Sequence, residues 1–387
     1  MGVYWNTVGL KVAACVTAAG FLGLGRAYPA RPLISQVSVY AARDDGYFAH
    51  RIPALLATGT GALLAFCEAR AGSASDSAPT DLVLKRSLDN GMTWTAAQVV
   101  AHFPGFTVGN PTPVEDDATG VIWLLMTANP AGETEKEIDE SSLKGARTVW
   151  ITHSSDGGAH WAAAKEITAS AKKSNWTWYA TGPGNGIQLT NGRLVVPCDH
   201  KVAGTNAFYS HVIYSDDHGK TWKTGGSAGP ETNESAVVEL ADGSLLLNMR
   251  SYADKHQRAI ALSHDGGLTW SAVHLDPALI EPVCQASLVR YSLARATGRN
   301  RLVFSNPADT DQRDRMTVRL SYDEAKSWPV GRLVYAGPSA YSSLAVLRDG
   351  TIGLLYERGA ANAYKGIEFA RFNLEWLTQG ADHFKAK

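Results

Sequence analysis

The stretch SDDHGKTW, residues 215–222, decides the fold because related octamers recur along the chain. The octamers start about 60 residues apart, an interval typical of repeat architectures. They share the pattern S-x-D-x-G-x-[TSH]-W, with Ala325 replacing glycine in the last, and the other four are SLDNGMTW from Ser87, SSDGGAHW from Ser154, SHDGGLTW from Ser263 and SYDEAKSW from Ser321.

Each octamer lies between alternating apolar runs, as in DLVLKRSLDNGMTW. This pattern predicts a strand, a tight turn and the start of another strand. Asp and Ser side chains can bind turn amides, and Gly tolerates a positive φ. About 60 residues per repeat suits a four-stranded antiparallel blade, so we predict an all-β, six-bladed β-propeller formed by one domain, residues 36–380. The octamers should anchor hairpins, because equivalent positions in different blades cannot all face one pocket.

Composition and charge limit the classes of function. The chain has 387 residues, 45% of them hydrophobic, enough for a large core. A formal net charge of −1 disfavours bulk attraction to nucleic acid or anionic membranes. The apolar run VAACVTAAGFLGLG predicts a signal peptide over residues 1–30, cleaved near 27–30, with a retained anchor as the alternative. We therefore expect a secreted or periplasmic monomer without a membrane span in the mature chain.

Cysteine content gives little further information. Outside the expected signal peptide the cysteines are Cys67, Cys198 and Cys284, an odd number without the spacing of a disulfide framework or a zinc site. The sequence indicates neither a cofactor nor a metal.

The residues that do not repeat carry the candidate chemistry. The segment YFAHRIPALLATGTGALLAFCEAR places Arg51 before Ile-Pro and ends a hydrophobic hairpin at Glu68 and Arg70. It resembles the R-I-P motif of the sialidases (neuraminidases), and the octamers resemble their Asp-boxes. The resemblance covers nearly the whole chain after about residue 40. It implies an exo-α-sialidase, a glycoside hydrolase that removes terminal sialic acids from glycoproteins, glycolipids or oligosaccharides.

The resemblance implies a site for the sialic acid carboxylate, which sits on the anomeric carbon. Planar guanidinium groups bind a fixed carboxylate well. The matching arginines are Arg51, Arg250 in LLLNMRSY and Arg313 in NPADTDQRDRM, with Arg315 as a rival for the third position.

The catalytic groups are also implied by resemblance. Tyr341 in GPSAYSSLAVL matches the nucleophile, and sialidases use tyrosine where most glycosidases use a carboxylate. A phenol needs a base, and Glu234 in ETNESAVVEL resembles that partner. Asp76 in ARAGSASDSAPTD matches the acid/base residue, whereas Asp81 begins a strand and is predicted to be structural.

Several positions resemble supporting parts of such a site. Glu357 in GLLYERG matches a glutamate that orients the first arginine, and Arg70 is expected to approach the ligand. Trp176, Trp178 and Tyr179 either line the glycerol or N-acyl region or pack in the core.

The resemblance thus implies an exo-α-sialidase that retains configuration through a sialyl-tyrosine intermediate. The nearest alternatives are a trans-sialidase or a hydrolase of a related nonulosonic acid. A non-catalytic sialoglycan-binding propeller needs the arginines but not the acid, base and nucleophile. A structural Asp-box propeller of the sorting-receptor kind needs none of them.

Overall fold

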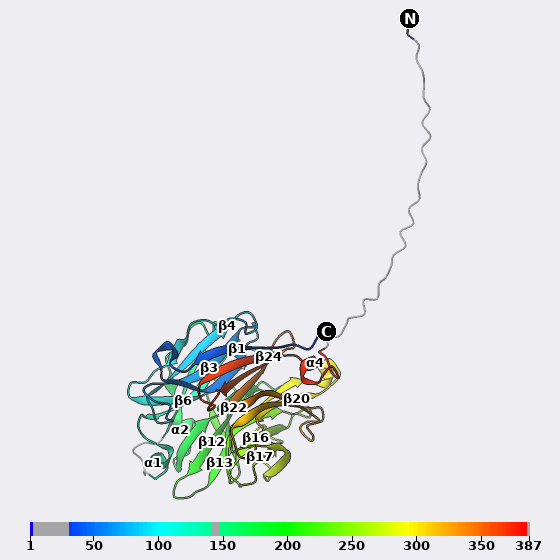
Figure 1. Cartoon of the computed structure of the whole chain (residues 1–387). Helices are drawn as coiled ribbons and strands as arrows, with labels where there is room; N and C mark the ends of the chain where they lie inside the picture. Colours follow the sequence, from blue (N-terminus) through cyan, green and yellow to red (C-terminus); the bar gives the residue numbers. More distant parts are fainter. Residues whose placement is uncertain (3–30, 141–146, 385–387) are drawn as a thin grey trace.

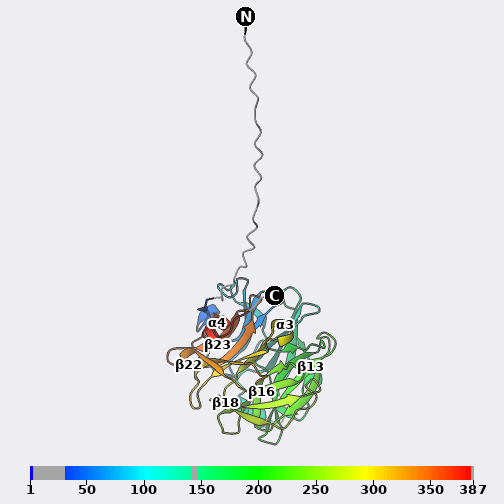
Figure 2. The same cartoon turned by 90° about the vertical axis from the view of Figure 1, so that its right-hand side faces the viewer.

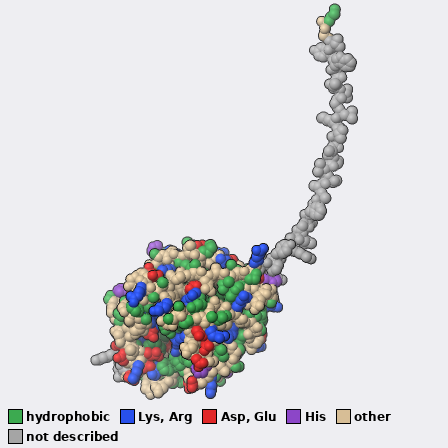
Figure 3. Space-filling view, in the orientation of Figure 1, with side chains coloured by type: hydrophobic (Ala, Val, Ile, Leu, Met, Phe, Trp, Pro, Cys, Tyr) green, Lys and Arg blue, Asp and Glu red, His purple; other side chains and the backbone are tan. Residues whose placement is uncertain are grey.

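The computed structural model describes residues 1–2, 31–140 and 147–384 (Figure 1). The expected signal peptide, apart from its first two residues, lies outside the described residues. No helix within the described ranges is both long and apolar enough to span a membrane. Acidic and basic side chains are interspersed on the face shown in Figure 3.

The described residues are mainly strands, which confirms the all-β prediction. A seven-stranded sheet contains β1 (Ile34–Ala41), β24 (Gly366–Phe372), β23 (Ile352–Arg358), β22 (Val330–Val346), β21 (Asp314–Ser321), β20 (Arg301–Pro307) and β19 (Ser287–Ser292). An eight-stranded sheet contains β2 (Ala49–Ala57), β3 (Leu63–Arg70), β4 (Thr80–Ser87), β6 (Phe106–Asp116), β7 (Val121–Pro130), β8 (Thr148–Ser154) and β9 (Lys165–Glu166), with β5 (Gln98–Ala101) on β4.

Two smaller sheets complete the body, and in Figure 2 their strands β13 and β16 follow β22 around the molecule. One contains β10 (Trp176–Thr181), β12 (Leu194–Val202), β13 (Phe208–Ser215) and β14 (Lys223–Ala228), with β11 (Ile187–Gln188) on β12. The other contains β15 (Thr232–Glu239), β16 (Leu245–Ser251), β17 (Gln257–Ser263) and β18 (His274–Ile280). The described helices are short: η1 (Asp44–Gly46), α1 (Glu135–Glu140), α2 (Thr168–Ala171), α3 (Ala294–Thr297) and α4 (Leu374–Leu377).

Each of the two large sheets is held together at one point by a distinctive strand pairing. The long strand β22 pairs with β21 along its first half and with β23 along its second half. Strands β4 and β6 meet through one parallel pair, Thr80 with Thr107. Strand β1 pairs with β24, so the first and last described strands lie side by side (Figure 1).

Seven strands surround the centre of the molecule and contact one another in sequence. The order of contacts is β22, β2, β6, β10, β12, β15, β19 and back to β22. Two cavities lie along these strands, of about 550 and about 590 Å³. Arg51 and Tyr341 line the first cavity, whereas Leu55 and Leu344, further along the same strands, line the second. On β2 and on β22, the residues lining the candidate-site cavity therefore precede those lining the second cavity.

The octamers form turns tied by their own side chains. In the third, Ser215 Oγ donates to Asp217 Oδ1 (2.8 Å) and accepts from the backbone N–H of Gly219 (2.8 Å). Asp217 also accepts from the N–H of Thr221 (2.8 Å), and the Trp222 indole is buried and donates to a turn carbonyl. The Ser–Asp bond recurs in all five octamers. No octamer residue lines the candidate-site cavity, which supports a structural role.

The fifth octamer keeps the turn without glycine. Ala325 has a φ of 65°, a left-handed conformation that costs an alanine more than a glycine. Its N–H still donates to Ser321 Oγ (2.9 Å), as the glycine does in the other octamers. The hydrogen bonds of the turn are therefore retained at the cost of some backbone strain.

Replacing Asp217 with alanine should destabilise the fold. Desolvation raises the pKa of the Asp217 carboxyl, but hydrogen bonds from Thr221 and Ser215 outweigh it and lower that pKa to about 2. Removing the carboxylate leaves these donors unpaired, and we expect a loss of about 1–3 kcal/mol in the free energy of unfolding in urea. The exposed Lys220→Ala is the control, and equal stability of the two variants would contradict a structural role for the octamer.

Candidate active site

The cavity of about 550 Å³ collects the residues that the sequence singled out. Its lining includes all six candidates for carboxylate binding and catalysis, together with Arg70: Arg51, Asp76, Glu234, Arg250, Arg313 and Tyr341. Glu357 is fully buried and lies behind Arg51. Residues from positions 51 to 341 of the chain thus meet in one depression.

Irregular pairing turns the functional side chains into this cavity. The register of β2 shifts between Arg51 and Ala54, and that of β15 shifts between Thr232 and Ser235 on either side of Glu234. Strands β6, β10 and β22 show similar shifts beside their own cavity-lining residues. Bulges re-aim side chains and are common beside active sites. The local departures from regular sheet therefore build the site.

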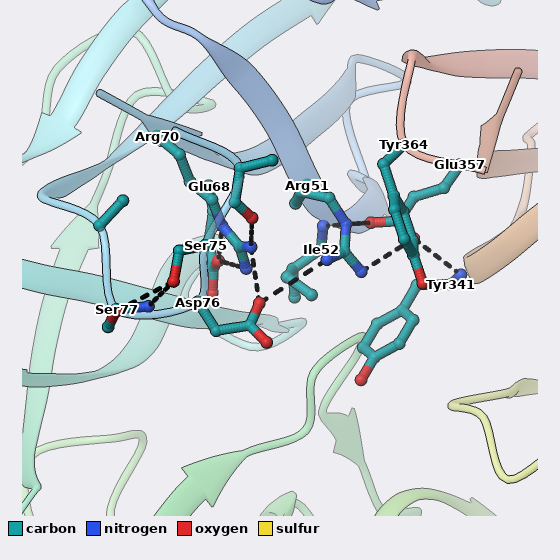
Figure 4. Close-up of polar contacts among 12 residues, drawn as sticks. Arg51, Ile52, Glu68, Arg70, Ser75, Asp76, Ser77, Tyr341, Glu357 and Tyr364 are labelled. Carbon is teal, nitrogen blue, oxygen red and sulfur yellow. Dashed lines mark hydrogen bonds and ion pairs between the residues drawn. The ribbon is translucent and has the colours of Figure 1, made fainter. Parts of the chain in front are cut away.

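Glu357, on β23 of the seven-stranded sheet, binds residues of β2 in the eight-stranded sheet (Figure 4). One carboxylate oxygen accepts from Arg51 Nε at 2.7 Å and from the N–H of Ile52 at 2.9 Å. The other accepts from the N–H of Tyr341 at 3.1 Å. A buried charge needs such partners, and here the same carboxylate positions an arginine and the backbone of the tyrosine.

The Tyr341 hydroxyl lies beside the Glu234 carboxylate and the Arg250 guanidinium. It donates to Glu234 Oε1 at 2.6 Å, and the other oxygen of Glu234 accepts from Arg250 Nη1 at 2.9 Å. Burial raises the pKa of Tyr341 and the Glu234 charge adds to this, while Arg250 acts against it. The phenol is neutral at ordinary pH, with a carboxylate in place to take its proton.

The structure selects between the two candidates for the third arginine. Arg313 lines the cavity and donates to Tyr364 Oη (3.2 Å) and to the carbonyl of Val283 (3.0 Å). Arg315 is exposed and does not line the cavity. No described carboxylate pairs with Arg313, so its charge is free to attract an anion. The Arg51 guanidinium lies over the ring of Tyr364, 3.9 Å from its centre.

Asp76 lies between two arginines at the rim of the cavity (Figure 4). Its Oδ1 is 2.6 Å from Arg70 Nη1 and 3.6 Å from Arg51 Nη1, yet its side chain is 84% exposed. Desolvation opposes the change, but the charges of Arg70 and Arg51 lower the pKa of Asp76 below its usual value. Arg70 is itself held by Glu68, two residues earlier on the same face of β3. Asp81 does not line the cavity.

The aromatic candidates divide between core and site. Trp176 is buried and stacks on His200 with ring centres 3.5 Å apart, and Tyr179 is fully buried. Trp178 lines the cavity, with the Arg147 guanidinium 4.2 Å from the centre of its ring. Of the three, only Trp178 is placed to meet a ligand.

Sequence reasoning missed part of the cavity wall. The missed residues are polar, come from β6 to β15 and include Asn110, Asn129, Glu133, Glu135, Arg147, Asp199 and Asn233. Asp199 left a signal, since it interrupts the apolar strand LVVPCDHKV. Cys67, Cys198 and Cys284 are buried and free. No group of three or more potential metal ligands occurs among the described residues.

The chain is similar to known sialidases in sequence and in structure. A family model for the BNR repeat-like domain matches residues 61–354. A sialidase of Micromonospora viridifaciens is 33% identical over 89% of this chain and 55% of its own length. An exo-alpha-sialidase of Aspergillus fumigatus is 33% identical over 87% of both chains. The solved structure of the Hadza microbial sialidase Hz136 superposes with a TM-score of 0.80 at 29% identity, covering 88% of this chain and 69% of the other.

These findings identify a repeat-built, all-β protein with a BNR repeat-like domain. The chain belongs to the sialidase family. It spans only about half of the Micromonospora sialidase but most of the Aspergillus enzyme.

Removing the Glu357 carboxylate should strongly destabilise the protein. Glu357→Ala leaves two backbone N–H groups unpaired and leaves Arg51 with only its longer contact to the exposed Asp76, 3.6 Å away. We expect a loss of about 3–5 kcal/mol in the free energy of unfolding in urea. Glu357→Gln keeps an acceptor and should lose less.

The control is Glu368→Ala on β24, which removes a more exposed partner of Arg358. That change should cost about 1 kcal/mol or less. If Glu357→Ala lost no more free energy of unfolding than this control, Glu357 would not hold the two sheets together.

Proposed function

We propose that the chain is an exo-α-sialidase that retains configuration through a sialyl-tyrosine intermediate. The observation that carries the proposal is the 2.6 Å hydrogen bond from Tyr341 to Glu234 inside a ring of arginines. The substrates would be sialylated glycoproteins, glycolipids or oligosaccharides. A neutral phenol suits this substrate, because a carboxylate nucleophile would be repelled by the sugar carboxylate.

Substrate binding would start with the sugar carboxylate. Arg51, Arg250 and Arg313 would bind it, with Arg51 held in place by Glu357. A second anion beside Arg51 competes with Asp76 for that charge and so weakens the interaction that lowers the pKa of Asp76. Binding would therefore favour protonation of Asp76, the state that a general acid requires.

The first chemical step would break the bond between the anomeric carbon and the aglycone oxygen. Asp76 gives its proton to that oxygen, Tyr341 Oη bonds to the anomeric carbon, and the phenol proton moves to Glu234. Water then attacks the same carbon while the bond from that carbon to Tyr341 Oη breaks. Asp76 takes a proton from the water, and Glu234 returns its proton to the Tyr341 oxygen. Two displacements at one carbon retain the configuration.

We further propose that the sheets form six four-stranded blades within residues 36–380. This division separates the large sheets at β22 and at the β4–β6 pair. The cyclic order of contacts among the inner strands supports it. We also propose that a signal peptide directs the protein to the periplasm or the medium, where it acts as a monomer.

Two substitutions test the chemical roles separately. Tyr341→Phe should reduce kcat/KM on aryl α-sialosides at least 1,000-fold, an order expected for loss of a nucleophile. Asp76→Asn should cost about 100-fold to 10,000-fold on natural sialosides, but much less on sialosides of acidic phenols, whose leaving oxygen needs no proton. The readouts are initial rates and the anomer first released, followed by NMR.

The wild-type protein and the circular dichroism of each variant serve as controls. A well-folded wild type without turnover would remove the enzyme assignment. Full activity in Tyr341→Phe would remove the nucleophile, and an equal loss on both leaving groups in Asp76→Asn would remove the acid. Sialoside products in place of free sialic acid would favour a trans-sialidase.

A further inference from the structure

The β18–β19 loop, residues 281–286, contacts two parts of the proposed machinery. The carbonyl of Val283 accepts from Arg313 Nη2 at 3.0 Å. The Gln285 side chain binds the residue after the nucleophile: its oxygen accepts from the N–H of Ser342 at 2.9 Å, and its nitrogen donates to the carbonyl of Ser342 at 2.9 Å. The position of this loop therefore fixes the guanidinium of one arginine and the backbone beside the nucleophile.

Arg258, on β17, binds the β18–β19 loop at two points and does not line the active-site cavity. Its Nη1 donates to Glu281 Oε2 at 2.6 Å and to the carbonyl of Cys284 at 2.7 Å. Its Nε donates to Asn248 Oδ1 at 2.7 Å, on the neighbouring strand β16. The fork of donors on one guanidinium thus ties the loop to the strand that carries Arg250.

Glu281 makes a second link to the same strand. Its other carboxylate oxygen accepts from the N–H of Ser251 at 2.7 Å, the residue that follows Arg250 on β16. Arg258 and Glu281 are both 0% exposed, so each loses its hydration. A buried ion pair of this kind stabilises a fold no better than well-packed apolar residues of similar volume. Its contribution here is geometric, because it holds the loop and β16 in one relative position.

The loop is strained at the residue that meets Arg313. Val283 has a φ of 52°, a left-handed conformation that is unfavourable for a β-branched residue. Such strain persists only where the surrounding contacts hold it in place, and it clusters at functional sites. The contacts on either side of Val283, at Glu281 and at Cys284, both come from Arg258. Without Arg258 the loop would relax, and the Val283 carbonyl would no longer hold Arg313.

We propose that Arg258 is a positioning residue for carboxylate binding. Through the β18–β19 loop and β16, it aligns Arg313 and Arg250 with the carboxylate of the substrate while contacting neither arginine's ligand itself. This role rests on the proposed function, because it takes the sugar carboxylate as the ligand of the two arginines. Charge-assisted hydrogen bonds depend on alignment, and a shift of about 1 Å in a positioned group can cost about 100-fold in rate.

The test replaces the buried pair and measures the affinity for a carboxylate. Arg258→Met/Glu281→Gln removes both charges at similar volume, so that no buried charge is left unpaired. The probes are the 2,3-dehydro analogue of sialic acid and its primary amide, which replaces the carboxylate with a neutral group. Calorimetry should show a loss of about 10-fold or more in affinity for the carboxylate. The loss for the amide should be about 3-fold or less, because a neutral group gains less from aligned charged donors.

A second variant keeps the charge but removes the fork. Arg258→Lys can still pair with Glu281, but a single ammonium cannot hold Asn248, Glu281 and Cys284 in the same geometry. Its affinity for the carboxylate should fall about 3-fold, with that for the amide unchanged. All affinities are measured at a temperature at which circular dichroism shows each variant to be folded. If the double variant does not fold, Arg258→Lys decides alone.

The matched control is Arg301→Met/Asp382→Asn, which removes another buried ion pair outside the cavity, with Arg301 Nε 2.7 Å from Asp382 Oδ2. It should leave the ratio of the two affinities at the wild-type value. An equal fall of this ratio in the control would show general loosening of the fold. An unchanged ratio in the folded Arg258 variants would show a purely structural pair, and equal losses for carboxylate and amide would show damage to the whole cavity. Each of these three results would overturn the proposal.

The wild-type protein separates the positioning role from the proposed function. If it neither turned over an aryl α-sialoside nor bound the carboxylate analogue more tightly than the amide, the proposed function would fail. If it did both while the Arg258 variants kept the wild-type ratio of affinities, only the positioning role would be refuted.

Discussion

The buried carboxylate of Glu357 is the constraint on which the site depends. It binds the guanidinium of Arg51 and the backbone N–H groups of Ile52 and Tyr341, and it is fully buried. These contacts join β23 and β22 to β2, near opposite ends of the chain. Without this anion, the cavity would hold clustered cations with too little compensating charge. One side chain therefore couples the packing of the seven-stranded sheet against the eight-stranded sheet to the positions of Arg51 and Tyr341.

The site combines rigid and exposed charges. Glu357 and Glu234 are buried and each binds an arginine through a short contact, whereas the Asp76 side chain is 84% exposed. Preorganised charges need no rearrangement during reaction, which favours fixed groups around the developing charge. The acid/base role that we propose for Asp76 has a different requirement, because the proton affinity of such a group must change between binding and reaction. Its exposed position between Arg70 and Arg51 makes the pKa of Asp76 responsive to a bound anion.

The sequence predicted those features that a local pattern of residues determines. It predicted less well the features that depend on how side chains are buried between the sheets. The octamers predicted the turns, and even Ala325 keeps the hydrogen bond expected of glycine. The choice between Arg313 and Arg315 required the path of the chain before β21. Arg147 was missed because nothing marks it in the sequence, and Asp199 left only the signal of a charged residue inside an apolar strand. Both become distinctive through their burial in the cavity wall. The register shifts in the inner strands depend on packing between sheets and had no local signal.

The central claim is that Tyr341 becomes covalently bonded to the sugar. A sialosyl fluoride with a second fluorine at C3 tests it, because that fluorine disfavours the positive charge at the anomeric carbon and slows hydrolysis of the intermediate. Mass spectrometry of the intact protein should show one added fluorosialosyl group, and peptide mapping should locate it on Tyr341. A label on Glu234 or Asp76, or rapid turnover of the reagent by Tyr341→Phe, would contradict the account.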